Sequence, residues 1–362
     1  MKIMLFIPTL GNGGAERVFV DYANGLANQG FKVYLVCLKG GSYESDVSKN
    51  VKIIKLNVRM RTAFFPFVFQ ILKIRPRVLL SGLTGPNLIS AMAGRITGVS
   101  KIITSVHNDL STENAITNSY FPRLEKPLVK LFCTLSHKII AVSEGVKDYL
   151  LSHKAVDKNK IEVIYNPIYK DSIIDSTQEE LPRYIEDRLD DQGFIVSAGR
   201  LVYQKGFDLL IDAYANAFQS NESPKLIILG EGPEREKLEE KIKNKNLEQK
   251  VILPGFLDNP YPIFSKARLY VLSSRWEGFG NVIVEALTCG TPVLAFDCRS
   301  GPREILEDLD SSYLVPNGSV KALSVAMYKK INEEHDCNAL AQYSQRFSVE
   351  VCVEKIAKVI VL

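Results

Sequence analysis

Short, continuous apolar runs recur along this chain, and each is followed by a polar or glycine-rich loop. Residues 3–7 are all apolar, a Gly-Asn-Gly-Gly loop follows at 11–14, and residues 15–28 carry apolar side chains at helical spacing before a second expected strand at 31–38. An uninterrupted apolar run is typical of a strand buried on both faces of a parallel sheet. The pattern predicts a strand–loop–helix–strand unit whose glycine-rich loop lies where open α/β sheets bind ligands.

The alternation continues in two series. Further strands are expected at 51–56, 78–81, 102–105, 138–142 and 161–165, and then at 194–199, 226–229, 251–253, 269–273, 292–296 and 313–315. Residues 171–193 hold eight acids and two arginines, which predicts a solvated linker. The chain is thus expected to be an α/β protein of two Rossmann-like doubly wound domains facing each other across a cleft, at 1–170 and 194–340, with a helical segment at 341–362 closing the fold.

Composition places the chain among ordinary globular proteins. Apolar residues make up 46% and charged residues 24% of it, and its six cysteines form no C-x-x-C pair. This favours a reduced cytoplasmic compartment and gives no indication of a metal site. The N-terminal apolar run lacks a signal-peptide cleavage pattern, and no run has the length of about 20 residues that spans a bilayer.

The charges are unevenly divided. Residues 1–170 hold 23 Lys and Arg against 11 Asp and Glu, a net of +12, whereas the rest of the chain has a net of −8. Within the first half, residues 59–77 contain five basic residues, no acid and four Phe within six positions. The stretch is either an ordinary crossover helix or a surface that binds anionic lipid headgroups on the inner face of a cell membrane. Both interpretations can be true if one face of the helix packs on the sheet and the other faces the lipid.

Residues 274–286 carry the densest chemical signal. Glu277 and Glu285 stand eight positions apart, the first in a glycine-rich turn and the second in the helix that follows. The backbone N–H groups of residues 279–281 are expected at the N-terminus of this helix, where an anion is held by unpaired donors and the helix dipole. Carboxylates can accept hydrogen bonds from vicinal hydroxyls, so the stretch predicts a site for a sugar joined to a phosphate.

Two other loops complete the expected site. Arg200 and Lys205 follow a predicted strand and open a helix, and two cations there suit a diphosphate without a metal; solvated surface cations are the alternative. The loop at 11–16 has Glu16 where a dinucleotide fingerprint needs Gly, so a dehydrogenase is disfavoured and a loop close to a diphosphate remains. The Asp308-Leu-Asp310 sequence is interpreted as an ordinary turn. His107 directly follows a strand, and structural and functional roles are equally open for it.

Several motifs together resemble the retaining, sugar-nucleotide-dependent glycosyltransferases of family 4, which have the GT-B fold. They run nearly from end to end of the chain: Gly13-Gly-Ala-Glu-Arg, Ser143-Glu, Asn166-Pro, Gly199-Arg-Leu with Lys205-Gly, Gly230-Glu-Gly-Pro, and Glu277-Gly-Phe-Gly-x4-Glu285. Asn166 is followed by Pro167, where the family commonly has Asn-Gly. The E-x7-E motif with the Arg and Lys pair is the most specific part of the match.

The resemblance implies a role for each matching position. Glu285 would hold the ribose hydroxyls of the nucleotide, and Glu277 would contact hydroxyls of the donor sugar. The N–H groups of Phe279, Gly280 and Asn281 would lie near sugar and phosphate.

The remaining implied contacts concern the phosphates and the sugar ring. Arg200 and Lys205 would bind the diphosphate, joined by the backbone of Gly13 and Gly14. His107 would support the positive charge that develops on the sugar ring, and Asn166 would belong to the donor site. Family members retain the anomeric configuration, commonly explained by front-side attack in which the leaving phosphate takes the acceptor's proton. Retaining glycosidases form a covalent intermediate instead, and the residues alone do not decide between the two routes.

The sequence is therefore interpreted as a glycosyltransferase that moves a hexose or N-acetylhexosamine from a nucleotide-diphosphate sugar, UDP-linked, to a lipid-linked glycan, with neither metal nor other cofactor. No nucleic-acid partner is expected. A GT-B-fold epimerase or phosphorylase and a non-catalytic sugar-nucleotide-binding subunit are the alternatives. A phosphorylase would need a lysine for pyridoxal phosphate, and no lysine shows that role. An epimerase would convert the sugar nucleotide without an acceptor.

Overall fold

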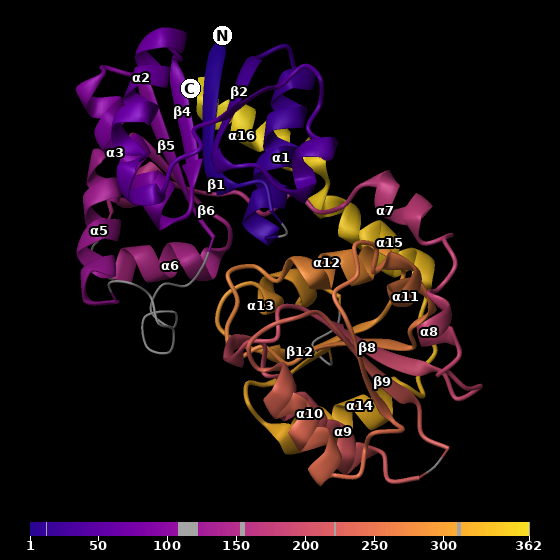
Figure 1. Cartoon of the computed structure of the whole chain (residues 1–362). Helices are drawn as coiled ribbons and strands as arrows, with labels where there is room; N and C mark the ends of the chain where they lie inside the picture. The colour runs from indigo at the N-terminus through magenta and orange to yellow at the C-terminus, as the bar shows by residue number, and fades with distance from the viewer. Residues whose placement is uncertain (12, 108–121, 153–155, 221, 310–312, 362) are drawn as a thin grey trace. The chain divides into compact units, whose positions relative to one another are not determined.

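The computed structural model describes the chain of 362 residues except for residues 12, 108–121, 153–155, 221, 310–312 and 362. The chain divides into two compact units (Figure 1). Unit 1 comprises Met1–Ile168 and Phe347–Leu362, and unit 2 comprises Tyr169–Arg346. Each unit is built on a parallel sheet with helices packed against it, so the expected α/β class with two Rossmann-like domains is confirmed.

Unit 1 contains seven strands in the order β3-β2-β1-β4-β5-β6-β7. Every pairing between them is parallel. The central strands of this order are buried because helices cover both faces of a parallel sheet, whereas the edge strands β3 and β7 are only partly buried. The strands are β1 (Lys2–Thr9), β2 (Lys32–Lys39), β3 (Lys52–Lys55), β4 (Val78–Gly82), β5 (Lys101–Val106), β6 (Lys138–Ala141) and β7 (Ile161–Val163).

The last helix of the chain belongs to unit 1. Val353 and Ile356 of this helix, α16 (Val349–Val361), are buried in the same core as β1 and α1 (Gly14–Asn28). The two helices approach closely at Gly25, where a Cβ atom would lie 2.5 Å from Val353. The predicted closing segment 341–362 is therefore divided: its first residues belong to unit 2, and residues 347–362 belong to unit 1. The other helices of unit 1 are α2 (Phe64–Ile74), α3 (Thr84–Ile96), α5 (Pro122–Leu135) and α6 (Glu144–Ser152).

Unit 2 contains six strands in the order β10-β9-β8-β11-β12-β13, again parallel. They are β8 (Phe194–Ala198), β9 (Lys225–Leu229), β10 (Val251–Gly255), β11 (Leu269–Leu272), β12 (Val293–Asp297) and β13 (Leu314–Pro316). The helices between and after them are α9 (Phe207–Ala217), α10 (Arg235–Asn244), α11 (Tyr261–Lys266), α12 (Asn281–Thr288), α13 (Pro302–Leu306), α14 (Val320–Lys330) and α15 (Cys337–Ser344).

The acidic stretch at 171–193 differs from the solvated linker that its charge suggested. It forms two short helices, α7 (Asp171–Ser176) and α8 (Arg183–Glu186), and belongs to unit 2. Ile173, Leu181 and Ile185 are buried, and α7 packs against α11 and α12. Three well-spaced apolar side chains are enough to attach a polar segment to a core. Among the described residues, no helix is both long and apolar enough to cross a membrane.

Candidate active site

The strand order of unit 2 changes direction between β8 and β11, which are neighbours in the sheet but not in the chain. Doubly wound sheets bind ligands beyond the carboxyl ends of their strands at such a switch point. β8 leads into Gly199 and Arg200, and β11 leads into the loop that carries Glu277. The stretches predicted to hold a diphosphate and a sugar therefore flank the switch point of this sheet.

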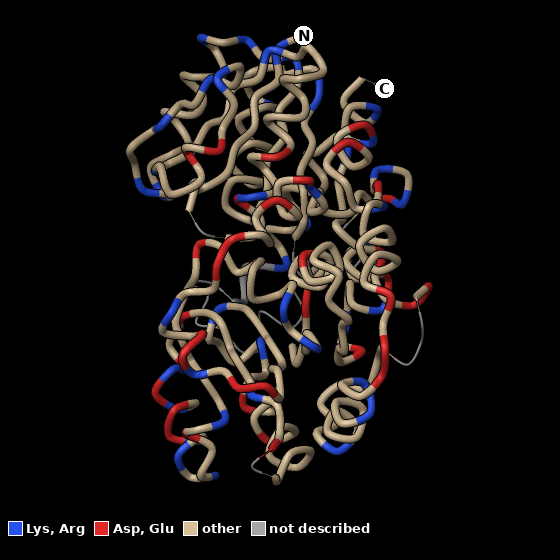
Figure 2. Tube along the Cα trace, turned by 90° about the vertical axis from the view of Figure 1, so that its right-hand side faces the viewer, with Lys and Arg blue, Asp and Glu red and all other residues tan. Residues whose placement is uncertain are grey.

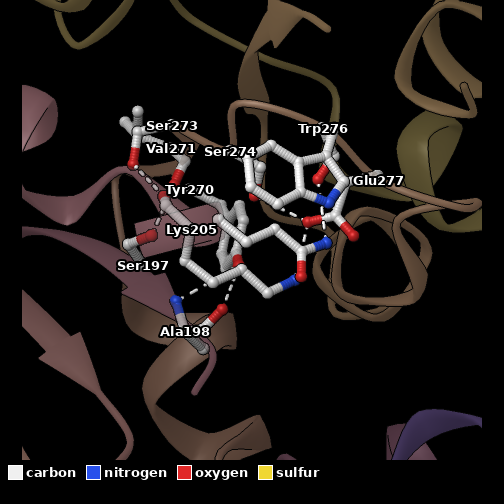
Figure 3. Close-up of polar contacts among 10 residues, drawn as sticks. Ser197, Ala198, Lys205, Tyr270, Val271, Ser273, Ser274, Trp276 and Glu277 are labelled. Carbon is white, nitrogen blue, oxygen red and sulfur yellow. Dashed lines mark hydrogen bonds and ion pairs between the residues drawn. The ribbon is translucent and has the colours of Figure 1, made fainter. Parts of the chain in front are cut away.

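Lys205 and Glu277 meet at this position although they are 72 residues apart. The Lys205 Nζ atom lies 2.6 Å from Oε1 of Glu277, and the hydroxyl of Ser274 donates a hydrogen bond of 2.6 Å to the same oxygen (Figure 3). Glu277 is only 6% exposed, and its backbone N–H donates to the carbonyl of Arg299. A buried carboxylate requires such partners because burial without them is costly.

The Lys205 loop is bound to the Glu277 loop through the backbone. Ser273 Oγ donates to the Lys205 carbonyl at 2.9 Å, and Gln204 Nε2 donates to the Trp276 carbonyl at 3.0 Å. Gly206 has a left-handed φ of +62°, and a Cβ atom on it would lie 2.1 Å from the Ser273 carbonyl oxygen. Only glycine satisfies both conditions. The Lys205-Gly206 pair in the sequence therefore has a structural reason.

Arg275 makes the loop contact rigid on its other side. Its guanidinium forms a two-pronged ion pair with Asp208, at 2.9 and 2.7 Å, and lies 3.8 Å from the ring centre of Tyr203. Burial alone would raise the pKa of Asp208, but the hydrogen bonds from Arg275 lower it. Arg200 differs from Arg275: it is exposed, and within the described part of the chain its side chain forms no ion pair. It is therefore accessible to a ligand.

The second acid of the motif lies in α12. Gly280 precedes this helix with a left-handed φ of +96°, Asn281 is its first residue, and Glu285 is half-buried within it. Phe279 is 2% exposed, and its carbonyl oxygen would lie 1.9 Å from a Cβ atom on Gly301. The glycine-rich turn is thus fixed by close backbone packing, which places the N-terminus of α12 next to the Glu277 loop.

Tyr270 links the strand ends beneath these groups and is a residue that sequence reasoning missed. Its hydroxyl accepts from the Ala198 N–H and donates to the Ala198 carbonyl, both at 3.2 Å (Figure 3). Burial raises the pKa of Tyr270 far above its usual range, and the charges of Glu285 and Glu277 raise it further. Both acids of the motif therefore act on this side chain.

In unit 1, the glycine-rich loop follows β1, as expected. Gly13 precedes α1 in an extended conformation, and Gly14 is the first helical residue. A Cβ atom on Gly13 would lie 2.1 Å from Glu16 Oε2, and Thr9 donates a 3.3 Å hydrogen bond to the other oxygen of Glu16. The position after the first strand of a doubly wound sheet suits a phosphate, and the role of Gly13 and Gly14 toward a donor stays a prediction.

His107 lies directly after β5 and is 8% exposed. Its Nε2 atom is 3.0 Å from Ser105 Oγ, and its ring lies 5.9 Å from that of Phe19, a residue of α1. Within the described residues, its Nδ1 atom is buried without a hydrogen bond. Burial lowers the pKa of His107 to about 4, so the imidazole is neutral at physiological pH. A neutral ring with one uncommitted nitrogen can contact a ligand hydroxyl.

The remaining predicted positions are Asn166 and the Asp308 stretch. Asn166 is buried, but it follows β7, the edge strand of its sheet, with β6 between that strand and β5. Asp308 forms a surface ion pair with Arg346 at 2.6 Å, as suits an ordinary turn, and Asp310 lies outside the described residues. Within the described part of the chain, no group of three His, Cys, Asp or Glu residues could hold a metal.

The fold and this arrangement define a class: a GT-B protein whose second domain carries acids and a cation at the strand ends. The family model described as glycosyl transferases group 1 matches residues 180–347, and that of glycosyltransferase family 4 matches residues 12–171. The chain belongs to glycosyltransferase family 4 and is a retaining glycosyltransferase that uses nucleotide-sugar donors in glycan biosynthesis.

Two curated relatives match this chain over most of its length and over most of their own. The N-acetylgalactosamine-N,N'-diacetylbacillosaminyl-diphospho-undecaprenol 4-alpha-N-acetylgalactosaminyltransferase of Campylobacter jejuni is 31% identical over 87% of this chain and 86% of the relative. The amylovoran biosynthesis glycosyltransferase AmsD of Erwinia amylovora is 26% identical over 99% and 97%. The structure of Anabaena HepE with UDP and glucose is similar in fold, with a TM-score of 0.80, 22% identity, and coverage of 100% of this chain and 99% of HepE.

Proposed function

We propose that this enzyme transfers a hexose or N-acetylhexosamine from a UDP-linked sugar to a lipid-linked glycan, with retention of anomeric configuration. The observation that carries the proposal is the contact of Lys205 with Glu277 at the switch point of unit 2, beside the helix that holds Glu285. A cation next to two acids suits a ligand that combines phosphate with vicinal hydroxyls. UDP was found in HepE, which shares the fold, and the Campylobacter jejuni relative is named for a diphospho-undecaprenol acceptor.

On the donor side, Glu285 accepts hydrogen bonds from the ribose hydroxyls, and Glu277 accepts them from the sugar that is transferred. The backbone N–H groups of residues 279–281 contact the sugar and phosphate. Glu285 lies at the fifth position of α12, so its carboxylate is separated from Glu277 by the helix start. That separation fits a ligand with a nucleoside at one end and a sugar at the other.

The diphosphate is the leaving group, and its charge rises as the bond to the sugar breaks. Arg200 is exposed and Lys205 is partly buried, so an accessible fork-shaped cation and a point-like cation converge on it. The backbone N–H groups of Gly13 and Gly14, at the start of α1, are proposed to bind phosphate as well. These groups can balance the charge of the diphosphate without a metal ion. Activity that is unchanged by EDTA would support this, and activity that requires added Mg²⁺ or Mn²⁺ would contradict it.

His107 is proposed to contact the donor sugar through a neutral imidazole, and Asn166 is proposed as a further donor-binding residue. Because the pKa of His107 is about 4, the ring does not add a positive charge at neutral pH. It therefore does not oppose an oxocarbenium-like transition state, and Nδ1 can make a hydrogen bond to a sugar hydroxyl. The acceptor's proton passes to the leaving phosphate on the same face, which gives retention.

A membrane surface is the second part of the proposal, and helix α2 carries it. Phe65, Phe69 and Leu72 are 79%, 61% and 57% exposed and share one face of this helix at i, i+4 and i+7. Phe67 and Ile71 face inward, at 0% and 2% exposed, and Phe67 stacks on Phe6 in the core. The inner face packs into the core, as the crossover-helix interpretation expects, and the outer face leaves an apolar stripe for lipid.

The charges around this stripe favour an anionic bilayer. Five exposed basic residues flank it in the chain: Arg59, Arg61, Lys73, Arg75 and Arg77. Figure 2 shows how Lys and Arg (blue) and Asp and Glu (red) are distributed along the chain. Exposed aromatic and aliphatic side chains beside cations are typical of interfacial helices that insert shallowly among headgroups. A lipid-linked acceptor would be presented at such a surface. Peripheral binding to the inner face of the cell membrane follows from the proposal.

Liposome co-sedimentation tests the membrane part. Vesicles rich in phosphatidylglycerol should bind the protein, and phosphatidylcholine vesicles should not. Replacing Phe65 and Phe69 by Ser should abolish binding, whereas the matched exposed apolar residues of α14, Val325 and Tyr328, should be replaceable without effect. Failure to bind anionic vesicles, together with full activity on a lipid acceptor after neutralisation of the five cations, would refute this part.

Donor screening tests the enzymatic part. The purified protein is incubated with UDP-linked hexoses and N-acetylhexosamines, first alone and then with a polyprenyl-diphosphate-linked glycan. Transfer should require the acceptor and should fail in a Glu285→Ala, Lys205→Ala double variant. Turnover that survives in this variant would refute the site assignment. Epimerised sugar nucleotide formed without an acceptor would favour the epimerase alternative, and UDP-sugar binding without turnover would favour the binding-subunit alternative.

A further inference from the structure

Ser274 holds one specific oxygen of Glu277. The Ser274 hydroxyl and the Lys205 ammonium both contact Oε1, each at 2.6 Å. No other hydrogen bond or ion pair of the Glu277 side chain is formed within the described residues, so Oε2 is not engaged there. Two strong donors on one oxygen fix the plane of the carboxylate and leave the other oxygen for a ligand.

The two donors differ in what a bound donor substrate would do to them. Lys205 is a flexible cation, and a diphosphate competes with Glu277 for it. Ser274 is 1% exposed, lies three residues before Glu277 in the same loop, and is neutral. A phosphate therefore attracts Lys205 away from Oε1 without displacing Ser274. The backbone of Glu277 is held independently by the Arg299 carbonyl.

We propose that Ser274 is a positioning residue that keeps the Glu277 carboxylate oriented toward the donor sugar after Lys205 has turned to the diphosphate. This rests on the proposed role of Glu277 as the acceptor of sugar hydroxyl hydrogen bonds. A carboxylate fixed at Oε1 presents Oε2 in a single direction, which lets it distinguish a correctly placed hydroxyl from its epimer. Ser274 thereby contributes both to the rate of transfer and to the choice of sugar, without touching the sugar.

The test compares Ser274→Ala, which removes the hydroxyl, with Ser274→Thr, which keeps it. The matched control is Thr291→Val: Thr291 is also 1% exposed and also donates a 2.6 Å hydrogen bond, to the Phe264 carbonyl away from Glu277. Measurements are kcat and KM for the preferred UDP-sugar, kcat/KM for its C4 epimer, and the Kd of UDP by calorimetry. UDP lacks the sugar that Glu277 is proposed to contact, so the Kd of UDP shows whether the rest of the site is intact.

Ser274→Ala should lower kcat by about 10- to 100-fold, the effect of losing a hydrogen bond to a charged group, and should narrow the preference over the C4 epimer. The Kd of UDP should change by less than about twofold, as one lost uncharged contact outside the nucleotide pocket predicts. Ser274→Thr should restore most of kcat, and the Thr291 variant should match the wild type.

Two results overturn the inference. Wild-type kcat and epimer preference in Ser274→Ala would show that Oε1 needs no second donor. Equal losses in kcat and UDP affinity, not rescued by Thr, would show a merely structural serine. A Glu277→Gln variant separates this from the proposed function: if that variant keeps full turnover, the proposed role of Glu277 fails as well, whereas its inactivity beside an active Ser274→Ala variant refutes only the inference.

Discussion

The buried imidazole of His107 should make the stability of unit 1 depend on pH. Its pKa falls from the ordinary 6.5 to about 4 because burial penalises the charged ring. In the unfolded chain the ring regains its ordinary pKa. Below pH 6.5 the unfolded chain therefore takes up a proton that the folded unit does not, and the free energy of unfolding decreases as the pH falls toward the folded pKa.

The magnitude follows from the two pKa values. Between about pH 7.5 and pH 5.5 the folded ring stays neutral and the unfolded ring becomes mostly charged, which removes about 1.3 kcal/mol of stability. The loss continues until about pH 4, where the folded ring also titrates, for a total of about 3 kcal/mol. A His107→Gln variant has no ring to protonate, so its stability should fall less over the same range.

Urea unfolding followed by circular dichroism, at about pH 7.5 and pH 5.5, gives the global free energy of unfolding. Hydrogen exchange of peptides from β4 and β5 gives the local free energy of opening in unit 1. The pH-dependent loss in those peptides should be smaller in His107→Gln than in the wild type by about 1.3 kcal/mol. The control is His335→Gln, which changes the one of the chain's four histidines that lies in unit 2, and it should leave the difference in β5 unchanged. Identical pH dependence of wild type and His107→Gln, or a His107 NMR signal that titrates near the ordinary pKa, would show that burial does not keep this imidazole neutral.

Three further predictions concern the switch point of unit 2. Tyr270→Phe removes the hydroxyl that bonds both the N–H and the carbonyl of Ala198. The free energy of unfolding, measured with urea and tryptophan fluorescence, should therefore fall by about 1–3 kcal/mol. An unchanged urea midpoint would contradict the bridging role of Tyr270. In Gly206→Ala the new Cβ atom meets a backbone oxygen, whereas Gly318 has a similar left-handed φ of +74° but open space around it. Gly318→Ala should therefore lower the free energy of unfolding by about 1 kcal/mol, and Gly206→Ala should lower it by more. Equal shifts of Tm in the two variants would contradict the close packing at Gly206. Lys205→Met should raise the Kd of UDP by at least about tenfold in calorimetry, and an unchanged Kd would exclude a diphosphate contact.

The sheets were predictable from the sequence because each central strand is buried on both faces. Such strands appear as continuous apolar runs, and the run at 269–273 became β11 with a difference of one residue. The structure of the connector at 171–193 was harder to predict, because its high charge gave no indication that Ile173 and Ile185 are buried. The return of α16 to unit 1 depends on packing between distant segments, which no local pattern shows.

For the site, the sequence identified the residue types that follow each strand, and parallel topology then placed Lys205 near Glu277. It could not show that Ser274 shares an oxygen of Glu277 with Lys205, or that Tyr270 bridges to Ala198. These contacts depend on side-chain direction, and serine or tyrosine at such positions is common in loops and strands. A serine three residues before a turn carboxylate was the available signal for Ser274.

The most direct test of the account is a single-turnover transfer assay that determines the anomeric configuration of the product by NMR. The UDP-sugar preferred in the donor screen is mixed with a polyprenyl-diphosphate-linked glycan, in the wild type and in Glu277→Gln. Transfer with retained configuration is expected in the wild type, and a large loss of transfer is expected in the variant. An inverted product, or equal transfer by the variant, would contradict the assignment of Glu277 and the retaining reaction at this site.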